Sequence, residues 1–217
     1  MDVLNMDNRE LKTGTTTIGI VCKDGLVLAA DKRATSGYLI SYKKFDKIMT
    51  ITNNVAVTVA GTVSDVQLLV KYLKAELKLK DLRTGRETSV KEAASLLASF
   101  VYNNIRKYSL IPGISHFILA GHDSKGTHMY DISPDGSIVA IDDYISSGSG
   151  SVMAFGVLET LYKKGLSVDE GVKLSAKCIN AAVQRDIASG NGIDIVTITK
   201  DGVKKVFSKE IDMRIEV

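Results

Sequence analysis

Residues 15–33, TTTIGIVCKDGLVLAADKR, contain two apolar runs that are separated by Lys23, Asp24 and Gly25. An Asp-Gly pair between two such runs is a strong hairpin signal, so the sequence predicts two antiparallel strands here. Three threonines open the first strand, and Asp31 lies near the end of the second. A hairpin that turns at residues 23–25 therefore brings Asp31 beside the threonines, to within about one residue of register.

Similar signals predict the elements of the remaining chain. Strand pairs are expected within residues 45–60, 117–131 and 193–208, and residues 138–141 are expected to form a further hairpin with their neighbours. Helices are expected at 64–80, 89–107, 152–164 and 167–188, where Ser64 would cap the first and Ser89 and Ser167 would open capping boxes. The order of strands, two helices, strands, two helices and strands predicts an α+β domain of antiparallel sheets with helices packed outside them.

Composition narrows the class of protein. The 217 residues are 45% hydrophobic and 24% charged, which excludes a disordered chain, a collagen and a disulfide-dense scaffold, and their number favours one domain. A net charge of +3 is too small to predict a nucleic-acid or membrane partner. We expect no membrane span and no secretory signal. Cys22 and Cys178 are far apart and are predicted to be buried thiols of a protein in the reducing cytoplasm.

Several motifs are incomplete. Gly148-Ser149-Gly150 resembles a dinucleotide loop, but Met153 stands where the third glycine belongs, so no cofactor is predicted. His116, His122 and His128 are evenly spaced, but no cysteine or carboxylate cluster accompanies them in the sequence, so no metal site is predicted.

The junction between Gly14 and Thr15 is the first candidate for chemistry. It separates a polar leader, residues 1–14, from the first strand. A threonine hydroxyl is a poor nucleophile until a base takes its proton, and an α-amine freed on the same residue can be that base. Such an amine titrates near pH ~8, so little tuning is needed. The alternative is that the threonines only begin a strand, since β-branched residues favour strands.

Further motifs support the first interpretation. They are Asp31-x-Arg33, Lys47, Ala60-Gly61, SGSGS at 147–151, and QRD at 184–186 followed by Ser189-Gly190. In this order and at these separations, the chain from Thr15 onward resembles the proteasome β-subunit family of N-terminal-nucleophile hydrolases, the archaeal type in particular. The resemblance implies a four-layer αββα sandwich and a threonine-type endopeptidase. It also implies a propeptide, residues 1–14, that is removed by self-cleavage, and a single catalytic domain, residues 15–217.

The resemblance assigns roles to six residues around the cleaved bond: Thr15 as nucleophile, Asp31 and Lys47 as a charged pair, and Ser149, Asp186 and Ser189 as a support for the amine. A positive charge on Lys47 would help keep that amine neutral, and Asp31 would orient the lysine. Asp186 and Ser189 are expected on one helix face. The alternatives are a structural ion pair at Asp31 and Lys47 and an ordinary helix end at Ser189.

The resemblance also implies a substrate site. Gly61 would supply a backbone N–H to the oxyanion hole, and the backbones of Thr35, Gly61 and Val63 would pair with an extended peptide. The side chain before the cut would enter a pocket of Ala34, Phe45, Met49, Val59, Val63 and Gln67. No member of this set is acidic, so cleavage after hydrophobic residues is expected. Each of them could instead be ordinary core.

The implied partners are proteasome α-subunits and other β-subunits in stacked seven-membered rings, unfolded polypeptide substrates, and ATP-dependent unfoldase caps that act through the α ring. Three alternatives stay open. One is a non-catalytic ring subunit that keeps its leader or needs another subunit for processing. Another is the simpler bacterial protease with six-membered rings. The last is a small-molecule module built on the Gly/Ser loop.

Overall fold

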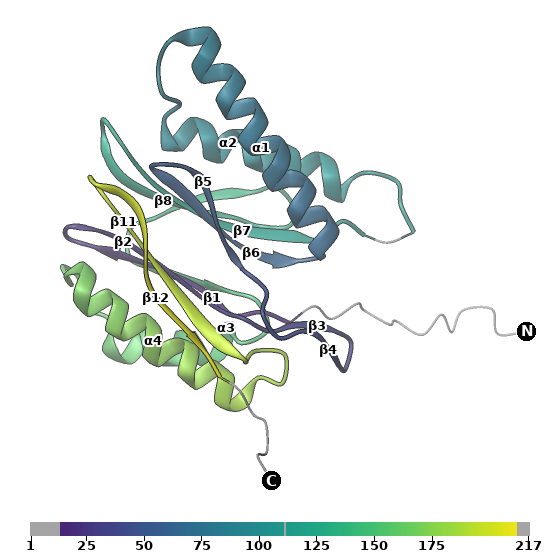
Figure 1. Ribbon diagram of the computed structural model, residues 1–217, viewed down its shortest axis with the longest axis vertical. Helices are drawn as coiled ribbons and strands as arrows, with labels where there is room; N and C mark the ends of the chain where they lie inside the picture. The colour runs from purple at the N-terminus through teal and green to yellow at the C-terminus, as the bar shows by residue number, and fades with distance from the viewer. Residues whose placement is uncertain (1–13, 111, 212–217) are drawn as a thin grey trace, which may run out of the picture.

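The computed structural model describes residues 14–110 and 112–211, and Figure 1 shows them arranged in layers. Residues 1–13 of the predicted leader lie outside the described residues. In chain order the elements are β1 (Thr17–Cys22), β2 (Gly25–Asp31), β3 (Ala34–Ser36), β4 (Leu39–Tyr42), β5 (Ile48–Thr52), β6 (Val55–Gly61), α1 (Val63–Thr84), α2 (Val90–Ile105), β7 (Ser115–Asp123), β8 (Gly126–Ile132), β9 (Ile138–Ile141), β10 (Tyr144–Ser147), α3 (Ser151–Leu161), α4 (Val168–Arg185), β11 (Gly192–Thr199) and β12 (Gly202–Glu210).

Two five-stranded antiparallel sheets form the centre of the domain. The first has the order β10-β1-β2-β11-β12, and the second has the order β5-β6-β7-β8-β9. The strands β3 and β4 form a separate hairpin. The predicted turn after Cys22 is confirmed, since Cys22 pairs with Gly25 and Thr17 with Ala30. The backbone N–H of Asp31 donates to Thr16 O at 3.2 Å, so the register expected from the sequence is confirmed too.

Helices cover the outer face of each sheet, so the fold is the four-layer αββα sandwich that the resemblance implied. In Figure 1 the helices α1 and α2 lie over one sheet, and α3 and α4 lie against the other. One core cluster joins α1 and α2 to their sheet, and another joins α3 and α4 to theirs. Between the sheets lies a third cluster, made of Leu26, Leu28, Ala56, Ile118, Ala120, Met129 and Ile198. All seven residues of β2 are buried, because this central strand is covered on both faces.

The predicted capping boxes are confirmed at two helices. At α2 the hydroxyl of Ser89 accepts from the backbone N–H of Glu92, and Ser167 does the same at α4 with Glu170. In each box the glutamate also accepts from the backbone N–H of the serine, so two otherwise free donors are satisfied.

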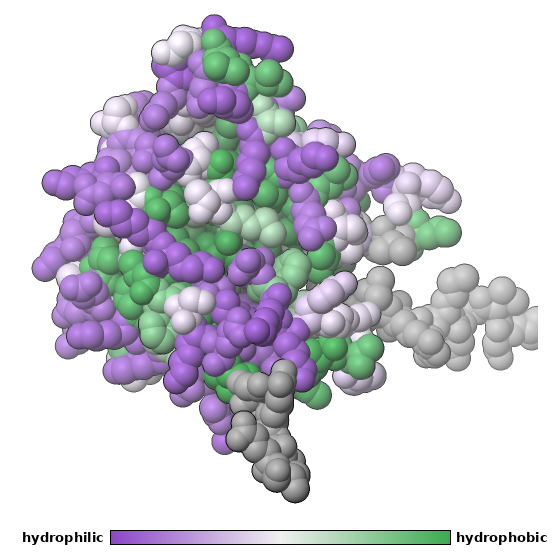
Figure 2. All heavy atoms as spheres, viewed as in Figure 1, coloured by the Kyte–Doolittle hydropathy of each residue, from purple (hydrophilic) through white to green (hydrophobic). Residues whose placement is uncertain are grey.

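Figure 2 shows the molecular surface from the same side as Figure 1, with hydrophilic side chains over all layers and hydrophobic side chains between them.

Two predicted helix ends were wrong. Ser64 does not cap α1, because the helix begins at Val63 with Thr62 as its N-cap and no side-chain cap. The last helix ends at Arg185 rather than near residue 188, and its C-cap Asp186 has extended dihedral angles, φ −91° and ψ 115°. Asp186 and Ser189 therefore do not share a helix face, and Ser189 lies in the loop beyond it. The hairpin β3–β4 was not predicted.

Candidate active site

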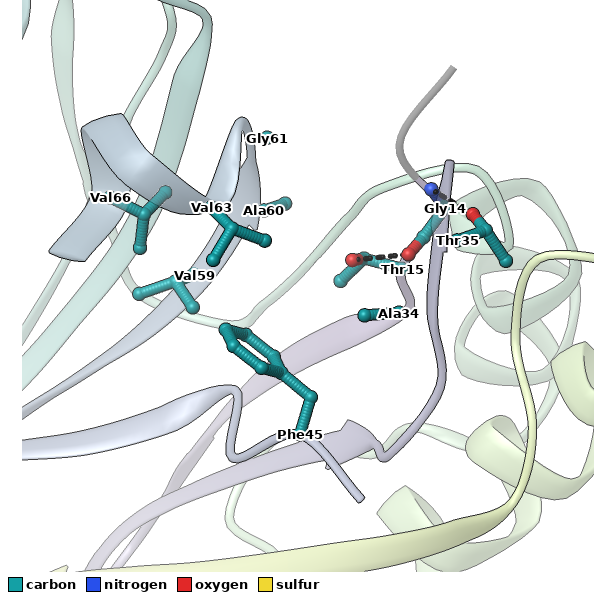
Figure 3. A pocket seen from close by; sticks show the side chains of 10 residues that line it. All are labelled: Gly14, Thr15, Ala34, Thr35, Phe45, Val59, Ala60, Gly61, Val63 and Val66. Carbon is teal, nitrogen blue, oxygen red and sulfur yellow. Dashed lines mark hydrogen bonds between the residues drawn. The ribbon is translucent and has the colours of Figure 1, made fainter. Parts of the chain in front are cut away.

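The bond between Gly14 and Thr15 lies at the entry to β1, in a buried and polar setting. Thr15 is 5% exposed, and its hydroxyl donates to the carbonyl oxygen of Gly14 at 2.6 Å. The backbone N–H of Gly14 donates to Thr35 Oγ1 at 3.0 Å. Figure 3 shows both contacts at the edge of a pocket. A Cβ on residue 14 would come within 1.7 Å of Ala188 Cβ, so only glycine fits this approach.

Asp31 and Lys47 form a buried ion pair beside this bond. Lys47 Nζ lies 2.7 Å from Asp31 Oδ1, and the two residues are 2% and 1% exposed. The same ammonium lies 3.4 Å from Gly14 O, so it shares that carbonyl with the Thr15 hydroxyl. Burial lowers the pKa of Lys47 from its usual 10.5, although the nearby carboxylate of Asp31 opposes this shift. The lysine is therefore closer to losing its proton than a lysine in water.

The Asp31 carboxylate is held by more than the lysine. Its Oδ1 also accepts from the Thr16 backbone N–H at 2.9 Å. Its Oδ2 accepts from the backbone N–H groups of Arg33 at 3.0 Å and Gly190 at 2.9 Å. These four donors come from four segments of the chain, so Asp31 ties β1, the end of β2, the segment before β5 and the loop after α4 together.

A hydrogen-bonded chain surrounds the Thr15 nitrogen. This N–H donates to Ser149 Oγ at 3.3 Å, and Ser149 Oγ donates to Asp186 Oδ2 at 2.6 Å. The hydroxyl of Ser189 also donates to Asp186 Oδ2 at 2.6 Å, and it lies 2.7 Å from Thr16 Oγ1. Asp186 and Ser189 thus meet although they do not share a helix, because the chain turns after Arg185. The structure brings all six residues predicted around the cleaved bond into one cluster.

The predicted substrate pocket is only partly the pocket of the structure. Gly14, Thr15, Ala34, Thr35, Phe45, Val59, Ala60, Gly61, Val63 and Val66 line the cavity beside Thr15. Figure 3 shows Phe45, Val59 and Val63 pointing into it. Met49 and Gln67 do not line this cavity: Met49 packs against the core under α1, and Gln67 is exposed. Their role in the substrate pocket stays a prediction.

Val66 lines this cavity beside Val63. Both Val66 and Gln67 follow Val63 by about one helical turn, but Val66 is buried and Gln67 is exposed. The apolar residues at 63 and 66 could have signalled this arrangement in the sequence. Ala60 of the Ala60-Gly61 motif also lines the cavity, although the sequence did not predict this role for it.

Arg33 is a further residue whose place the sequence did not predict. Its Nε donates to Asn191 Oδ1 at 2.8 Å, and its Nη1 donates to Ile187 O at 2.7 Å. The guanidinium thereby fixes the loop that carries Ser189. Asn191 has a φ of 60°, a left-handed value that asparagine tolerates better than most residues, so this loop needs such an anchor.

Within the part of the chain that the structure describes, no three or more His, Cys, Asp or Glu side chains gather as they would around a metal ion. No described helix has the length and apolar character that a membrane crossing requires.

The αββα sandwich, with a threonine at the entry to an inner strand and a lysine–aspartate pair against it, is the arrangement of the N-terminal-nucleophile fold. The comparisons are more specific. The family model described as "Proteasome subunit" matches residues 11–198, and the chain belongs to this family.

Proteins named "Proteasome subunit beta" are similar over nearly their full length. The one from Methanothermobacter thermautotrophicus is 42% identical over 97% of this chain and 99% of its own. The one from Ferroglobus placidus is 41% identical over 94% of this chain and 95% of its own. The one from Archaeoglobus fulgidus is 38% identical, with 96% of each chain covered. This chain is accordingly a β-subunit of the proteasome core, a protease that is assembled from several subunits.

Proposed function

We propose that this chain is a catalytic β-subunit, a threonine-type endopeptidase whose nucleophile is the Thr15 hydroxyl. The observation that carries the proposal is the 2.6 Å contact of Thr15 Oγ1 with the Gly14 carbonyl, beside the buried pair of Lys47 and Asp31. A structural β-subunit has no need for a buried ammonium at this carbonyl, because burying a charge is costly unless it has a partner and a use.

The first reaction is removal of residues 1–14. Thr15 Oγ1 attacks the carbonyl carbon of Gly14; the new C–O bond forms, the C–N bond breaks, and the hydroxyl proton ends on the Thr15 nitrogen. Water then hydrolyses the resulting ester, which leaves a Gly14 carboxylate and restores the hydroxyl. Lys47, 3.4 Å from Gly14 O, stabilises the negative charge that develops on this oxygen. Ser149, 3.3 Å from the Thr15 nitrogen, is placed to assist the proton transfer.

The second reaction is hydrolysis of substrate peptides. The freed α-amine of Thr15 takes the hydroxyl proton, Thr15 Oγ1 attacks the substrate carbonyl, and water releases the acyl group from the ester. Ser149, Asp186 and Ser189 hold the amine through the hydrogen-bonded chain that already surrounds this nitrogen. Gly61 lines the pocket and supplies the backbone N–H for the oxyanion.

The substrates we propose are unfolded polypeptides, cut after hydrophobic residues. The pocket wall formed by Phe45, Val59, Val63 and Val66 is apolar. The backbones of Thr35, Gly61 and Val63 would pair with the extended peptide. The assembly is the stacked seven-membered ring particle with α-subunits, other β-subunits and ATP-dependent caps. We place it in the cytoplasm, a proposal supported by two cysteines that are both free thiols.

Intact mass after co-expression with a proteasome α-subunit tests the proposal. We expect the wild-type chain in assembled particles to begin at Thr15, and the Thr15→Ala variant to keep residues 1–14. Thr15→Ser keeps a hydroxyl and should still be cut. Thr160→Ala is the matched control, because Thr160 is an exposed threonine on α3 whose hydroxyl only contacts Gly156 O.

Peptide hydrolysis after a hydrophobic residue should follow processing and be absent in Thr15→Ala. A wild-type chain that keeps its full leader in assembled particles, and cleaves no peptide, would contradict the proposal. That result would favour the non-catalytic subunit, or a β-subunit that another chain must process.

A further inference from the structure

The apolar layer between the two sheets ends, near the active site, in a chain of polar side chains from three strands. His116 on β7 places Nε2 2.6 Å from Asp131 Oδ1 on β8, and Nδ1 2.7 Å from Ser147 Oγ on β10. A carboxylate only accepts hydrogen bonds, so Nε2 carries the hydrogen. Nδ1 and the Ser147 hydroxyl form the second hydrogen bond of the ring.

The hydrogen-bonded series of Asp131, His116 and Ser147 is largely buried, and its polar atoms have hydrogen-bond partners. Ser147 is 3% exposed, and the side chains of His116 and Asp131 are 24% and 13% exposed. The second carboxylate oxygen of Asp131 accepts from Ser133 Oγ at 3.3 Å. Partly buried polar groups that all have partners hold one another in a single arrangement, and they do so more firmly than isolated hydrogen bonds in water.

These hydrogen-bonded side chains lie between two parts of the candidate active site. His116 pairs in register with Ala60, next to Gly61, the candidate oxyanion residue of the second sheet. Ser147 is the last residue of β10 in the first sheet, and two residues later Ser149 meets the Thr15 nitrogen. The contact between His116 and Ser147 therefore joins the strand pair that carries Gly61 to the loop that carries Ser149.

The apolar contacts of the layer between the sheets cannot do this as well, because apolar contacts have no preferred direction. Thr17 and Thr58 also face this layer, but their buried hydroxyls have no hydrogen-bond partner among the described residues. Near the active site, directed hydrogen bonds between the sheets come from His116 with Ser147 and from Lys47 with Asp31. Of these two contacts, only that of His116 with Ser147 involves β10, which leads into the Ser149 loop.

A serine, a histidine and an aspartate that are hydrogen-bonded in a row also form the catalytic triad of serine hydrolases. That role does not fit here. Ser147 is 3% exposed and faces the opposite sheet, so no substrate carbonyl can reach its hydroxyl.

We propose that His116 is a positioning residue: held by Asp131, it fixes Ser147 and with it the spacing between Gly61 and the Ser149 loop. The inference rests on the proposed peptidase function. It predicts that loss of the contact lowers the rate of bond cleavage more than the binding of peptide, because the reacting groups are displaced while the apolar pocket is unchanged.

The test uses particles co-assembled with the α-subunit and carrying His116→Leu, Ser147→Ala, or both. We expect kcat for a peptide with a hydrophobic residue before the cut to fall by about 10- to 100-fold, with KM changed by less than about twofold. His116→Gln should recover most of the rate, since the glutamine amide offers an NH2 group that can donate to Asp131 and an oxygen that can accept from Ser147. The double variant should be no slower than the slower single variant.

His128→Leu is the matched control. His128 lies on β8 with Nε2 3.5 Å from Asp123 Oδ1, and its side chain is 33% exposed, so it is a similar pair at the other end of the same sheet. Its kcat should stay near that of the wild type. If His116→Leu fails to assemble, Ser147→Ala still tests the contact, because it removes only the hydroxyl.

Suppose that the wild type is active, and that His116→Leu or Ser147→Ala lowers kcat no more than His128→Leu does. That result would overturn the inference but not the proposed function. Equal losses of kcat in His116→Gln and His116→Leu, or losses that multiply in the double variant, would overturn the inference in the same way. A wild type that neither loses its leader nor cleaves peptide would overturn the proposed function, and the inference with it.

Discussion

Replacing Asp31 by asparagine should destabilise this fold far more than its isosteric shape suggests. The carboxylate accepts four hydrogen bonds, from the N–H groups of Thr16, Arg33 and Gly190 and from the Lys47 ammonium. One side of an asparagine amide is itself a donor, so two of these four donors lose their acceptor in either orientation.

The size of the loss follows from burial. Asp31 is 1% exposed and Lys47 is 2% exposed, so water cannot replace the lost partners. If the amide NH2 faces Lys47, a buried charge is left unpaired, at a cost of about 3–5 kcal/mol. If it faces Arg33 and Gly190, two buried N–H groups are unsatisfied, at about 1–3 kcal/mol each. We therefore expect Asp31→Asn to lower the free energy of unfolding by about 3–6 kcal/mol, a large part of a typical domain's stability.

Urea unfolding of the full chain, followed by far-UV circular dichroism, measures this difference. The double variant Asp31→Asn with Lys47→Met should lose less than the sum of the two single variants, because it leaves no unpaired charge. Glu210→Gln is the control. It breaks an ion pair with Lys44 in which both side chains are at least half exposed, and it should cost less than about 1 kcal/mol. A loss below about 1 kcal/mol for Asp31→Asn, or additive losses in the double variant, would refute the reasoning.

Three further predictions concern other parts of the fold. Gly148→Ala should lower kcat at least about tenfold, because φ is +91° and a Cβ would lie 2.0 Å from the Thr15 carbonyl oxygen. Gly156→Ala is its control: a Cβ there would meet no atom within 4 Å among the described residues, so kcat should be unchanged. Burial raises the pKa of Cys22 and of Cys178 from 9.0 to about 12, so at pH 9 both native thiols stay protonated and should resist iodoacetamide until urea unfolds the chain. Ser89→Ala should cost about 1 kcal/mol in urea unfolding through loss of the α2 cap, and no loss would argue against that contact.

The sequence was most informative where local chemistry decides the structure. The hairpin at residues 23–25 was predictable because Asp24-Gly25 selects a tight turn. The capping boxes at Ser89 and Ser167 were predictable because each needs only a partner three residues away. These elements also determine the start of the site, since the hairpin alone brings Asp31 to the threonines.

The failures share a tertiary cause. The short strand β10 pairs with β1, which lies about 130 residues away in the sequence. No local pattern in its four residues, YISS at 144–147, indicates such a distant partner. The end of α4 was extended too far because Ser189-Gly190 resembles a helix end, whereas the observed end is set by Asp186 turning toward Ser149 and Ser189. Val66 was not predicted to line the pocket, because the sequence does not show which of two adjacent residues on the first turn of α1 faces it.

The pairing of β1 with β10 has a consequence for the order of events in the cell. Thr15 is among the first residues to be synthesised, but Ser149 and Asp186 come from the last third of the chain. At ~5–20 residues per second, roughly 10 to 30 seconds separate the synthesis of Thr15 from that of Asp186. Until β10 is made, β1 has no partner on one edge, and until Asp186 is made the support around the Thr15 nitrogen is incomplete. A chain whose translation stops before Ser189 thus carries the hydroxyl without the complete site.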